Sequence, residues 1–357
     1  MLSLLCRSYK IFPAVINLAS HERASCESAL RRVGCARRRR FGLCPLAFSF
    51  FGVLLRVPLL TFFALLGLPD TSSAQGFAFT ETEKSLRLLY DGRPFAETMV
   101  EPFSPARSED TYKVYTHLYD ITGKYLLTKG PGGKFPHHRG LFIGWRETTV
   151  GGRTFDTWHM KDCYQEHRSW LIHEASPQRA IQRERIAWCD LQAQCFLEEE
   201  REIIFQTEAN GTRVITFRSV LTPTEGTVQF RGDPHHAGMH VRLANEVSEH
   251  EDTTEYVWPA GTVVEKDDVV NGTWWVAVKA HIENRDWYFL HITQRTPTGL
   301  PPRYSVRKYG RFGGYFEAEA DPAHPLHTAF QVVVSEKPLT VEECARRCQA
   351  FQSEPSQ

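Results

Sequence analysis

The stretch WWVAVKAHIENRDWYFLHI, residues 274–292, decides the fold class. Its two halves, 274–282 and 287–292, are rich in Trp, Tyr, Phe, Val and Ile, which favour strands. Between them stands Glu283-Asn284-Arg285-Asp286, a polar turn signal. Two such runs joined by a short polar segment predict a hairpin of antiparallel strands.

Similar runs recur on both sides of this hairpin. They are 77–80, 85–90, 112–119, 141–147, 201–207, 214–221, 239–247, 256–258 and 329–334, and the turn signals between many of them include Asp91-Gly92, Asn210-Gly211 and Asn271-Gly272. We expect a helix only at the C-terminal end, because Thr340 and Glu343 have capping-box spacing and residues 341–351 contain no Gly or Pro. The sequence therefore predicts an all-β fold, a large antiparallel two-sheet sandwich with a short C-terminal helix. Its size is that of the supersandwich in aldose-epimerase-like enzymes.

Residues 1–74 have the features of an export leader. A basic run, Arg37 to Arg40, precedes an apolar stretch over 41–68, and small residues end at Ala74, where we expect cleavage. Arg56 interrupts the apolar stretch, so the signal itself is expected to begin near Leu54. Two alternatives remain: Arg38-Arg39 as a twin-arginine signal, and 41–68 as a retained membrane anchor.

The remaining 75–357 are expected to form a single domain in the periplasm or outside the cell. No run after Ala74 approaches 18 apolar residues, so no stable membrane span is expected there. Removing the leader's ten Lys and Arg from 42, and its three Asp and Glu from 42, leaves 32 and 39, a net charge of −7. This acidic balance argues against a nucleic-acid partner. Five cysteines remain, and only Cys189 with Cys195 could bridge a hairpin.

The segment Phe135-Pro136-His137-His138-Arg139-Gly140 is the first candidate for chemistry. Two imidazoles beside a guanidinium suit proton transfer or the holding of an anion. We expect His137 or His138 to be catalytic and Arg139 to bind substrate. In an extended backbone the two histidines would point to opposite sides, so only one would face a given pocket.

The second candidate is the segment over 232–246. It contains His235 and His236, and strand alternation then gives a polar row opposite an apolar one. The polar row is His240, Arg242 and Glu246. We expect His236 and Glu246 to be catalytic and His240 and Arg242 to bind substrate. His236 and His240 would lie about 13 Å apart in a flat strand, too far for one metal ion.

Two further segments suit a sugar ring. Over 304–316, aromatic and cationic residues alternate, with Arg307, Tyr309 and Arg311 as expected substrate-binding residues. The structural alternative for this segment is a twisted strand pair at the rim of the sandwich. Phe155-Asp156-Thr157-Trp158-His159 offers Trp158 as a sugar platform, although a buried Trp is more often part of a core.

At these segments the chain resembles the PmoA-like family of exported bacterial proteins. The resemblance rests on the residues already quoted and on Ala244-Asn245-Glu246. The family label suggests a methane-oxidising membrane subunit, but such a subunit needs several apolar spans, so we treat the label as a misnomer for activity. Many relatives read Asp-His-Pro-His-His-Arg-Gly where this chain has Lys134-Phe135 before Pro136. Because this chain lacks that acid and that first imidazole, the resemblance gives weaker grounds to expect that the loop binds a metal ion through all its members.

We expect an exported carbohydrate-active enzyme that acts on a glycoside or sugar acid by acid–base chemistry, as a hydrolase, lyase or epimerase. The partner would be a small-molecule or oligosaccharide substrate. The metal ligands, if any, are unknown, and a divalent metal is an open alternative. The rival hypothesis is a noncatalytic carbohydrate-binding module. Convergence of the histidines would favour the enzyme, and a flat exposed aromatic platform would favour the module.

Overall fold

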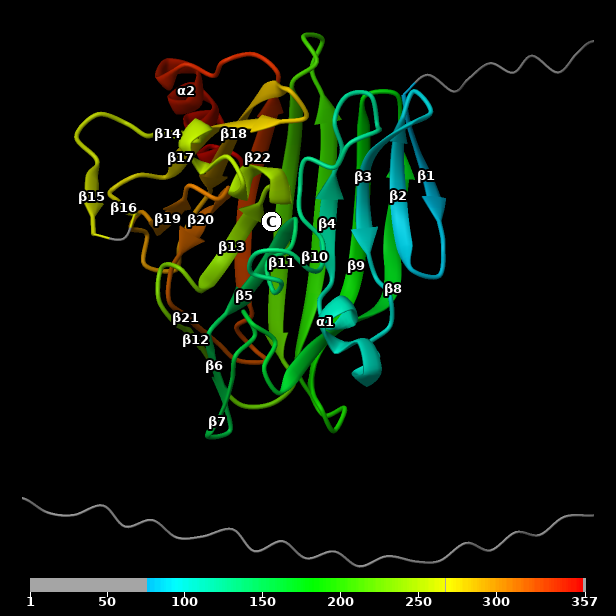
Figure 1. Ribbon diagram of the computed structural model, residues 1–357. Helices are drawn as coiled ribbons and strands as arrows, with labels where there is room; N and C mark the ends of the chain where they lie inside the picture. Colours follow the sequence, from blue (N-terminus) through cyan, green and yellow to red (C-terminus); the bar gives the residue numbers. More distant parts are fainter. Residues whose placement is uncertain (1–75, 267, 356–357) are drawn as a thin grey trace, which may run out of the picture. The chain divides into compact units, whose positions relative to one another are not determined.

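The computed structural model describes residues 76–266 and 268–355. The expected leader and the cleavage site after Ala74 lie outside these residues. Within the described part, the strands form three antiparallel sheets and the helices are few and short (Figure 1). Among the residues described, no helix has the length and apolar character needed to cross a bilayer.

The first sheet has ten strands. In spatial order they are β1 (Phe77–Glu81), β2 (Ser85–Tyr90), β3 (Arg93–Met99), β4 (Tyr115–Leu118), β5 (Leu141–Trp145), β13 (Ala237–Arg242), β20 (Arg311–Tyr315), β19 (Arg303–Arg307), β16 (Val269–Asn271) and β15 (Val263–Glu265). Strand β13 lies between β5 and β20, which are distant from it in sequence. This pairing brings the 135–140, 232–242 and 304–316 segments together.

The second sheet has eight strands, and a third has four. The eight are β14 (Glu255–Val257), β17 (Trp275–Ile282), β18 (Arg285–Thr293), β22 (Leu326–Ser335), β11 (Arg213–Pro223), β10 (Cys195–Thr207), β9 (Arg179–Asp190) and β8 (Cys163–Ala175). The four are β21 (Ala318–Ala320), β12 (Val228–Arg231), β6 (Glu147–Val150) and β7 (Arg153–Phe155). The hairpin predicted over residues 274–292 is formed by β17 and β18, which pair from Trp275↔Ile292 to Ile282↔Arg285.

The two large sheets pack face to face around one apolar core. Aromatic rings cross the interface: Phe95 of the first sheet meets Phe205 of the second at 6.1 Å, and Phe312 meets Phe289 at 6.4 Å. Fully burying such a side chain stabilises the fold by about 1.5–3 kcal/mol. The predicted two-sheet sandwich is therefore confirmed.

Five helical segments complete the described chain. They are η1 (Pro105–Arg107), α1 (Ser108–Thr111), η2 (Asn245–Ser248), η3 (Glu251–Thr253) and α2 (Val341–Gln352). The predicted C-terminal helix is α2, and the Thr340 side chain caps it by accepting from the Glu343 N–H at 3.2 Å. Its buried face, which includes Cys344, Cys348 and Phe351, packs on the second sheet beside Trp275 and Leu290.

Several local predictions needed correction. Strands β8 and β9, of 13 and 12 residues, were missed because charged residues interrupt their apolar pattern. Asn271-Gly272 is not a hairpin turn, because β16 pairs with β15 and β19 rather than with β17. Whether Cys189 and Cys195 pair could not be read from the sequence, and the structure shows a disulfide between them.

Candidate functional site

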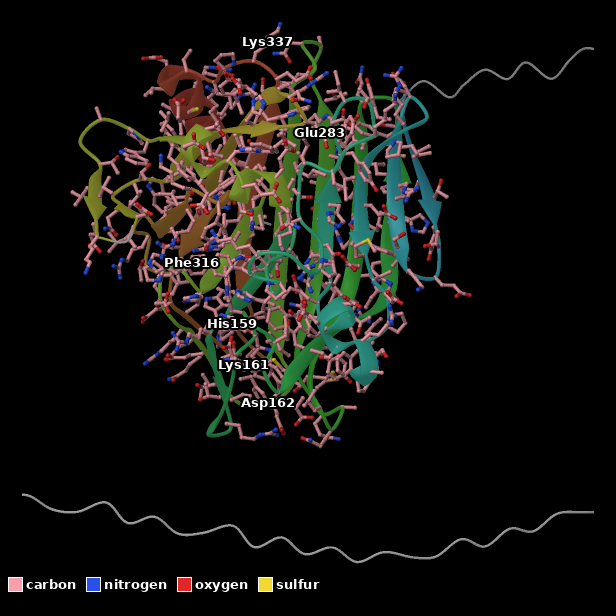
Figure 2. The ribbon with its side chains drawn as sticks, in the orientation of Figure 1. His159, Lys161, Asp162, Glu283, Phe316 and Lys337 are labelled. Atoms are coloured by element: carbon pink, nitrogen blue, oxygen red, sulfur yellow. A yellow bond between two sulfur atoms is a disulfide. The ribbon has the colours of Figure 1, made fainter. Side chains whose placement is uncertain are left out.

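Six histidines from three segments gather at one place in the domain. They are His137 and His138 before β5, His159 after β7, and His235, His236 and His240 at the start of β13. The ring centroids of His137 and His138 lie 4.2 Å apart, and those of His137 and His159 lie 4.4 Å apart. The rings of His159 and His236 follow at 5.1 Å. We call His137, His159 and His236 the histidine cluster (His159 is labelled in Figure 2).

Two turns in this site are built in the same way. In the first, the backbone N–H and the Nδ1 atom of His159 each lie 2.8 Å from a carboxylate oxygen of Asp156. In the second, Nδ1 of His236 lies 2.9 Å from Oδ1 of Asp233, and its backbone N–H donates to the Asp233 carbonyl at 3.0 Å. Each aspartate therefore orients the imidazole three residues later along the chain.

These pairings determine which ring nitrogen is free. An ionised carboxylate only accepts hydrogen bonds, so Nδ1 of His159 and of His236 is the donor to it, and Nε2 is the nitrogen of each ring left to exchange a proton with a ligand. Burial raises the pKa of Asp156, but the hydrogen bonds from His159 outweigh this and leave it below its usual value. Burial lowers the pKa of His236, and Asp233 opposes that shift. The site thus holds two oriented imidazole bases whose Nε2 atoms form no hydrogen bond to any described residue.

The third member of the cluster is neutral. Burial, with smaller contributions from the nearby Lys113 and His159, lowers the pKa of His137 to about 2. Lys113 is itself buried, and its Nζ donates to the carbonyls of His137 at 3.2 Å and Trp158 at 2.7 Å. This lysine therefore ties the two histidine-bearing turns together.

A chain of hydrogen bonds beneath the cluster centres on Arg311. Its guanidinium donates to Nδ1 of His240, to Oγ of Ser305 and to the Tyr309 hydroxyl, each at 3.0–3.1 Å. Ser305 Oγ also lies 2.8 Å from Nδ1 of His235. The Arg311 guanidinium faces the Trp158 ring at 5.8 Å, so an aromatic and cationic floor supports the imidazoles.

The surroundings of the cluster are strongly cationic. Five basic side chains, each no more than 4 % exposed, lie there: Lys113, Lys129, Arg139, Arg242 and Arg311. Burial lowers the pKa of Lys113 well below its usual value and that of Lys129 to about 8, so the positive charge rests chiefly on the three arginines. Within the described ranges none of them forms an ion pair with a carboxylate, and their donors go to backbone carbonyls and neutral side chains. A buried charge without a counter-ion is costly, so this concentration of positive charge favours an anionic ligand.

Several buried polar atoms in this region also have no partner. They are Nδ1 of His138, Nε1 of Trp158, Nε of Arg139, and Nε and Nη2 of Arg242. Every one except the imidazole nitrogen is an obligatory donor. Acceptor oxygens of bound water or of a ligand would satisfy them, once the site opened enough to admit such an oxygen.

The cluster opens at the surface rather than into a deep cavity. The His236 side chain is 33 % exposed and that of His159 is 21 % exposed. Three cavities of about 240, 510 and 380 Å³ are lined by other residues. Among residues 76–266 and 268–355, no group of three or more His, Cys, Asp or Glu side chains is placed to hold a metal ion.

Residues 85–349 match the model of a family of unknown function, DUF6807. The chain belongs to this family. No protein with a curated description matches it. The matched range contains every residue of the site described above, so the site is part of the family's domain.

Solved structures offer only distant similarity to this DUF6807 protein. A GalM/aldose epimerase homologue from C. elegans aligns with 9 % identity and a TM-score of 0.31, over 73 % of this chain and 99 % of the other. A 4-alpha-glucanotransferase from Thermococcus litoralis aligns with 11 % identity and a TM-score of 0.22, over 73 % of this chain and 37 % of the other. Similarity this low carries no argument about activity.

The structure brings most of the predicted site residues together in the DUF6807 domain. These are His137, His138, His236, His240, Trp158, Tyr309, Arg311, Arg139 and Arg242. Arg139 is fully buried and bonds to backbone carbonyls, among them those of Pro136 and His138, so it supports the 135–138 turn rather than facing the surface. Arg307 is partly exposed, and its Nη1 atom lies 3.7 Å from Oδ2 of Asp268.

Two predictions about the site were wrong, and the condition attached to a third, an extended backbone at His137 and His138, is not met. Glu246 does not continue the polar row of β13, because the strand ends at Arg242 and Glu246 lies in η2, where it accepts from the Glu283 N–H. Glu283 and His159 lie well apart in Figure 2. His240 and Arg242 do not line an open cleft, because both faces of β13 are buried. His137 and His138 do not diverge, because a turn closed by the His138 N–H and the Phe135 carbonyl brings their rings together.

Sequence reasoning also missed four functional groups. His159 was named only as a neighbour of Trp158 and was not expected to be catalytic. Asp156 and Asp233 each stand three residues before a histidine, and this repeated Asp-x-x-His spacing was the signal that could have identified them. Lys113 gave no comparable signal, because it lies within an apolar run that predicted a strand.

Proposed function

We propose that this protein is an exported carbohydrate-active enzyme that transfers protons on a sugar acid, with His159 and His236 as the catalytic residues. The observation that carries the proposal is the pair of Asp-oriented imidazoles with ring centroids 5.1 Å apart. Two imidazoles held this close can both reach one bound substrate, so that one accepts a proton while the other donates one. His137 would complete the site as a neutral hydrogen-bonding group.

Imidazole pairs favour some reactions over others. Most glycosidases use two free carboxyl groups on either side of the scissile bond. Here the carboxylates of Asp156 and Asp233 are engaged by histidines and serve to orient them. Removal of a proton from the carbon next to a carboxylate needs a positioned general base, and an imidazole with a free Nε2 can serve as one. The arrangement therefore supports an epimerase or lyase rather than a hydrolase.

The buried cations support a substrate with a carboxylate. Removing the proton next to a carboxylate places extra negative charge on its oxygens, and nearby fixed positive charge stabilises that state. Two unit charges about 8 Å apart interact by about 2 kcal/mol at an effective dielectric constant of about 20. The buried arginines Arg139, Arg242 and Arg311 have no carboxylate partner and supply such charge through space rather than by direct contact. A neutral sugar would gain no stabilisation from this charge.

The rival function, a noncatalytic sugar-binding module, receives less support. Such a module would present an exposed aromatic platform. Trp158, the expected platform, has no exposed surface, and its ring packs against His240 at 4.7 Å. The histidines converge instead of being scattered. Both observations favour the enzyme.

A substrate screen with matched variants tests the proposal. Purified protein would be incubated with uronic acids, oxidised sugars and neutral glycosides, and products followed by NMR. His159→Asn and His236→Asn are expected to lower turnover of a confirmed substrate by about 10²–10⁴-fold, the usual contribution of a general base or acid. The control is His324→Asn, because His324 pairs with Asp321 at the same spacing but its side chain is 84 % exposed. Unchanged turnover in both cluster variants would overturn the proposal.

A further inference from the structure

A cavity of about 510 Å³ lies at an end of the sandwich, away from the histidine cluster. Its walls come from the β2–β3 turn, the β10–β11 turn, the end of β22 and Ile121. Lys337, one of its lining residues, is labelled at the top of Figure 2, whereas His159 is in the lower half. The volume is within the range of small-molecule sites, which is about 300–1,000 Å³.

Arg213 is the unusual feature of this cavity. Its side chain lines the cavity while only 7 % of the residue is exposed, and the guanidinium lies over the Phe95 ring at 4.6 Å. Its Nη1 donates to the Tyr119 carbonyl. Nε and Nη2 have no partner among the described residues and are not sealed from solvent. The free edge of the guanidinium therefore faces the cavity.

The acids near this guanidinium do not neutralise it. Asp120, whose negative charge acts most strongly on Arg213, forms no ion pair with it and accepts from the Thr122 hydroxyl and the N–H groups of Lys124 and Tyr125. Glu336 lines the cavity but pairs with Arg285 at 2.8 Å, and Asp91 accepts from the Gly76 N–H. Arg213 forms no ion pair within the described ranges, and neither does Arg93, which lines the same cavity. Burial lowers the pKa of Arg213 to about 10, which still leaves it charged at neutral pH.

We infer that this cavity is a second binding site, which takes the oxyanion of a small molecule on the Nε and Nη2 atoms of Arg213. A guanidinium presents these two N–H groups side by side, which matches two oxygens of a carboxylate, sulfate or phosphate. Arg93 adds a second positive charge at the rim, and Phe95 gives an apolar wall for the rest of the ligand. The site is separate from the proposed catalytic cluster.

The test follows the Arg213 Nε–H resonance by NMR while sodium sulfate, inorganic phosphate or glucuronate is added at constant ionic strength. The resonance is assigned by its loss in Arg213→Met. We expect a saturable shift with at least one of the three anions. Response to glucuronate alone would identify a carboxylate ligand, and response to all three a general oxyanion site. No saturable shift with any of them would overturn the inference.

Matched variants make the test independent of whether Arg213→Met folds. Arg93→Met, at an exposed position, is expected to weaken anion binding about threefold or more by removing one charge. Ala209→Trp, in the exposed turn at the rim, is expected to fill the cavity and abolish the shift. Arg231→Met, an exposed arginine paired with Glu319 elsewhere, should leave the affinity unchanged. If Arg93→Met and Ala209→Trp both bound the anion with wild-type affinity, the inference would be contradicted.

Discussion

The imidazoles of His159 and His236 lie with their ring centroids 5.1 Å apart, although one follows β7 in the four-stranded sheet and the other precedes β13 in the ten-stranded sheet. Each ring is fixed through Nδ1 by an aspartate of its own turn. The contact between the rings is therefore a contact between two preorganised units. Such preorganisation is what proton-transfer sites require, because it removes the cost of orienting the base during the reaction.

Asp233 should control the protonation of His236. Its carboxylate raises the pKa of the imidazole and so opposes the lowering by burial. Asp233→Asn removes the negative charge, so the pKa of His236 should fall further, measured from the ring ¹H shifts over a pH titration. The variant should also lose the preference for the Nδ1–H tautomer, visible in ¹⁵N spectra. An unchanged pKa and tautomer would show that the aspartate does not act on this imidazole.

Stability should fall steeply in mild acid. Burial lowers the pKa of His117 to about 4 and that of His291 to about 3, so each binds fewer protons in the folded than in the unfolded chain. Unfolding is therefore favoured as the pH drops below about 6.5, the unfolded value, and each histidine costs about 1.4 kcal/mol per pH unit until its folded pKa is reached. Denaturant unfolding between pH 6 and pH 4.5 measures this slope.

A single variant checks the source of that acid sensitivity. His117→Gln removes one of these buried imidazoles, so its slope between pH 6 and pH 4.5 should be smaller by about 1.4 kcal/mol per pH unit. The stability of the variant at pH 7 does not affect this comparison, because only the slope is compared. A slope equal to that of the wild type would mean that His117 is protonated equally in both states.

Gly238 should be essential for the position of β13. Its φ is +90°, and a Cβ there would lie 2.0 Å from the Gly314 carbonyl oxygen of β20. Gly238→Ala combines backbone strain with a clash against backbone, so a loss of about 3 kcal/mol or more in unfolding free energy is expected. Gly151→Ala is the control, since φ is +55° but nothing lies within 4 Å. It should lose only about 1 kcal/mol. Similar losses in the two variants would refute the predicted clash.

The strand pattern made much of the fold predictable, but the site depended on contacts that no local pattern contains. The hairpin of β17 and β18 and the helix α2 followed from apolar runs, a polar turn and the Thr340 cap. Strand pairing of β13 with β5 and β20 determines which histidines meet, and sequence order does not reveal it. Glu246 was misplaced because alternation was extended beyond the end of β13.

The aspartates show a different limit. A short-range motif, Asp-x-x-His, occurs in this chain at Asp156, Asp233 and Asp321, and all three form the same carboxylate–imidazole bond. Only the first two bring their imidazoles together. The motif identifies the unit, while tertiary packing decides whether it belongs to a site.

Exchange of a carbon-bound hydrogen tests the central claim most directly. The protein would be incubated in D₂O with uronic acids, and ¹H NMR would follow the proton on the carbon next to the carboxylate. If His159 and His236 act as the bases, that proton should exchange with solvent in the wild type and in His324→Asn, and exchange should be slowed at least about 100-fold in His236→Asn. Exchange or turnover at the wild-type rate in both His159→Asn and His236→Asn would contradict the account.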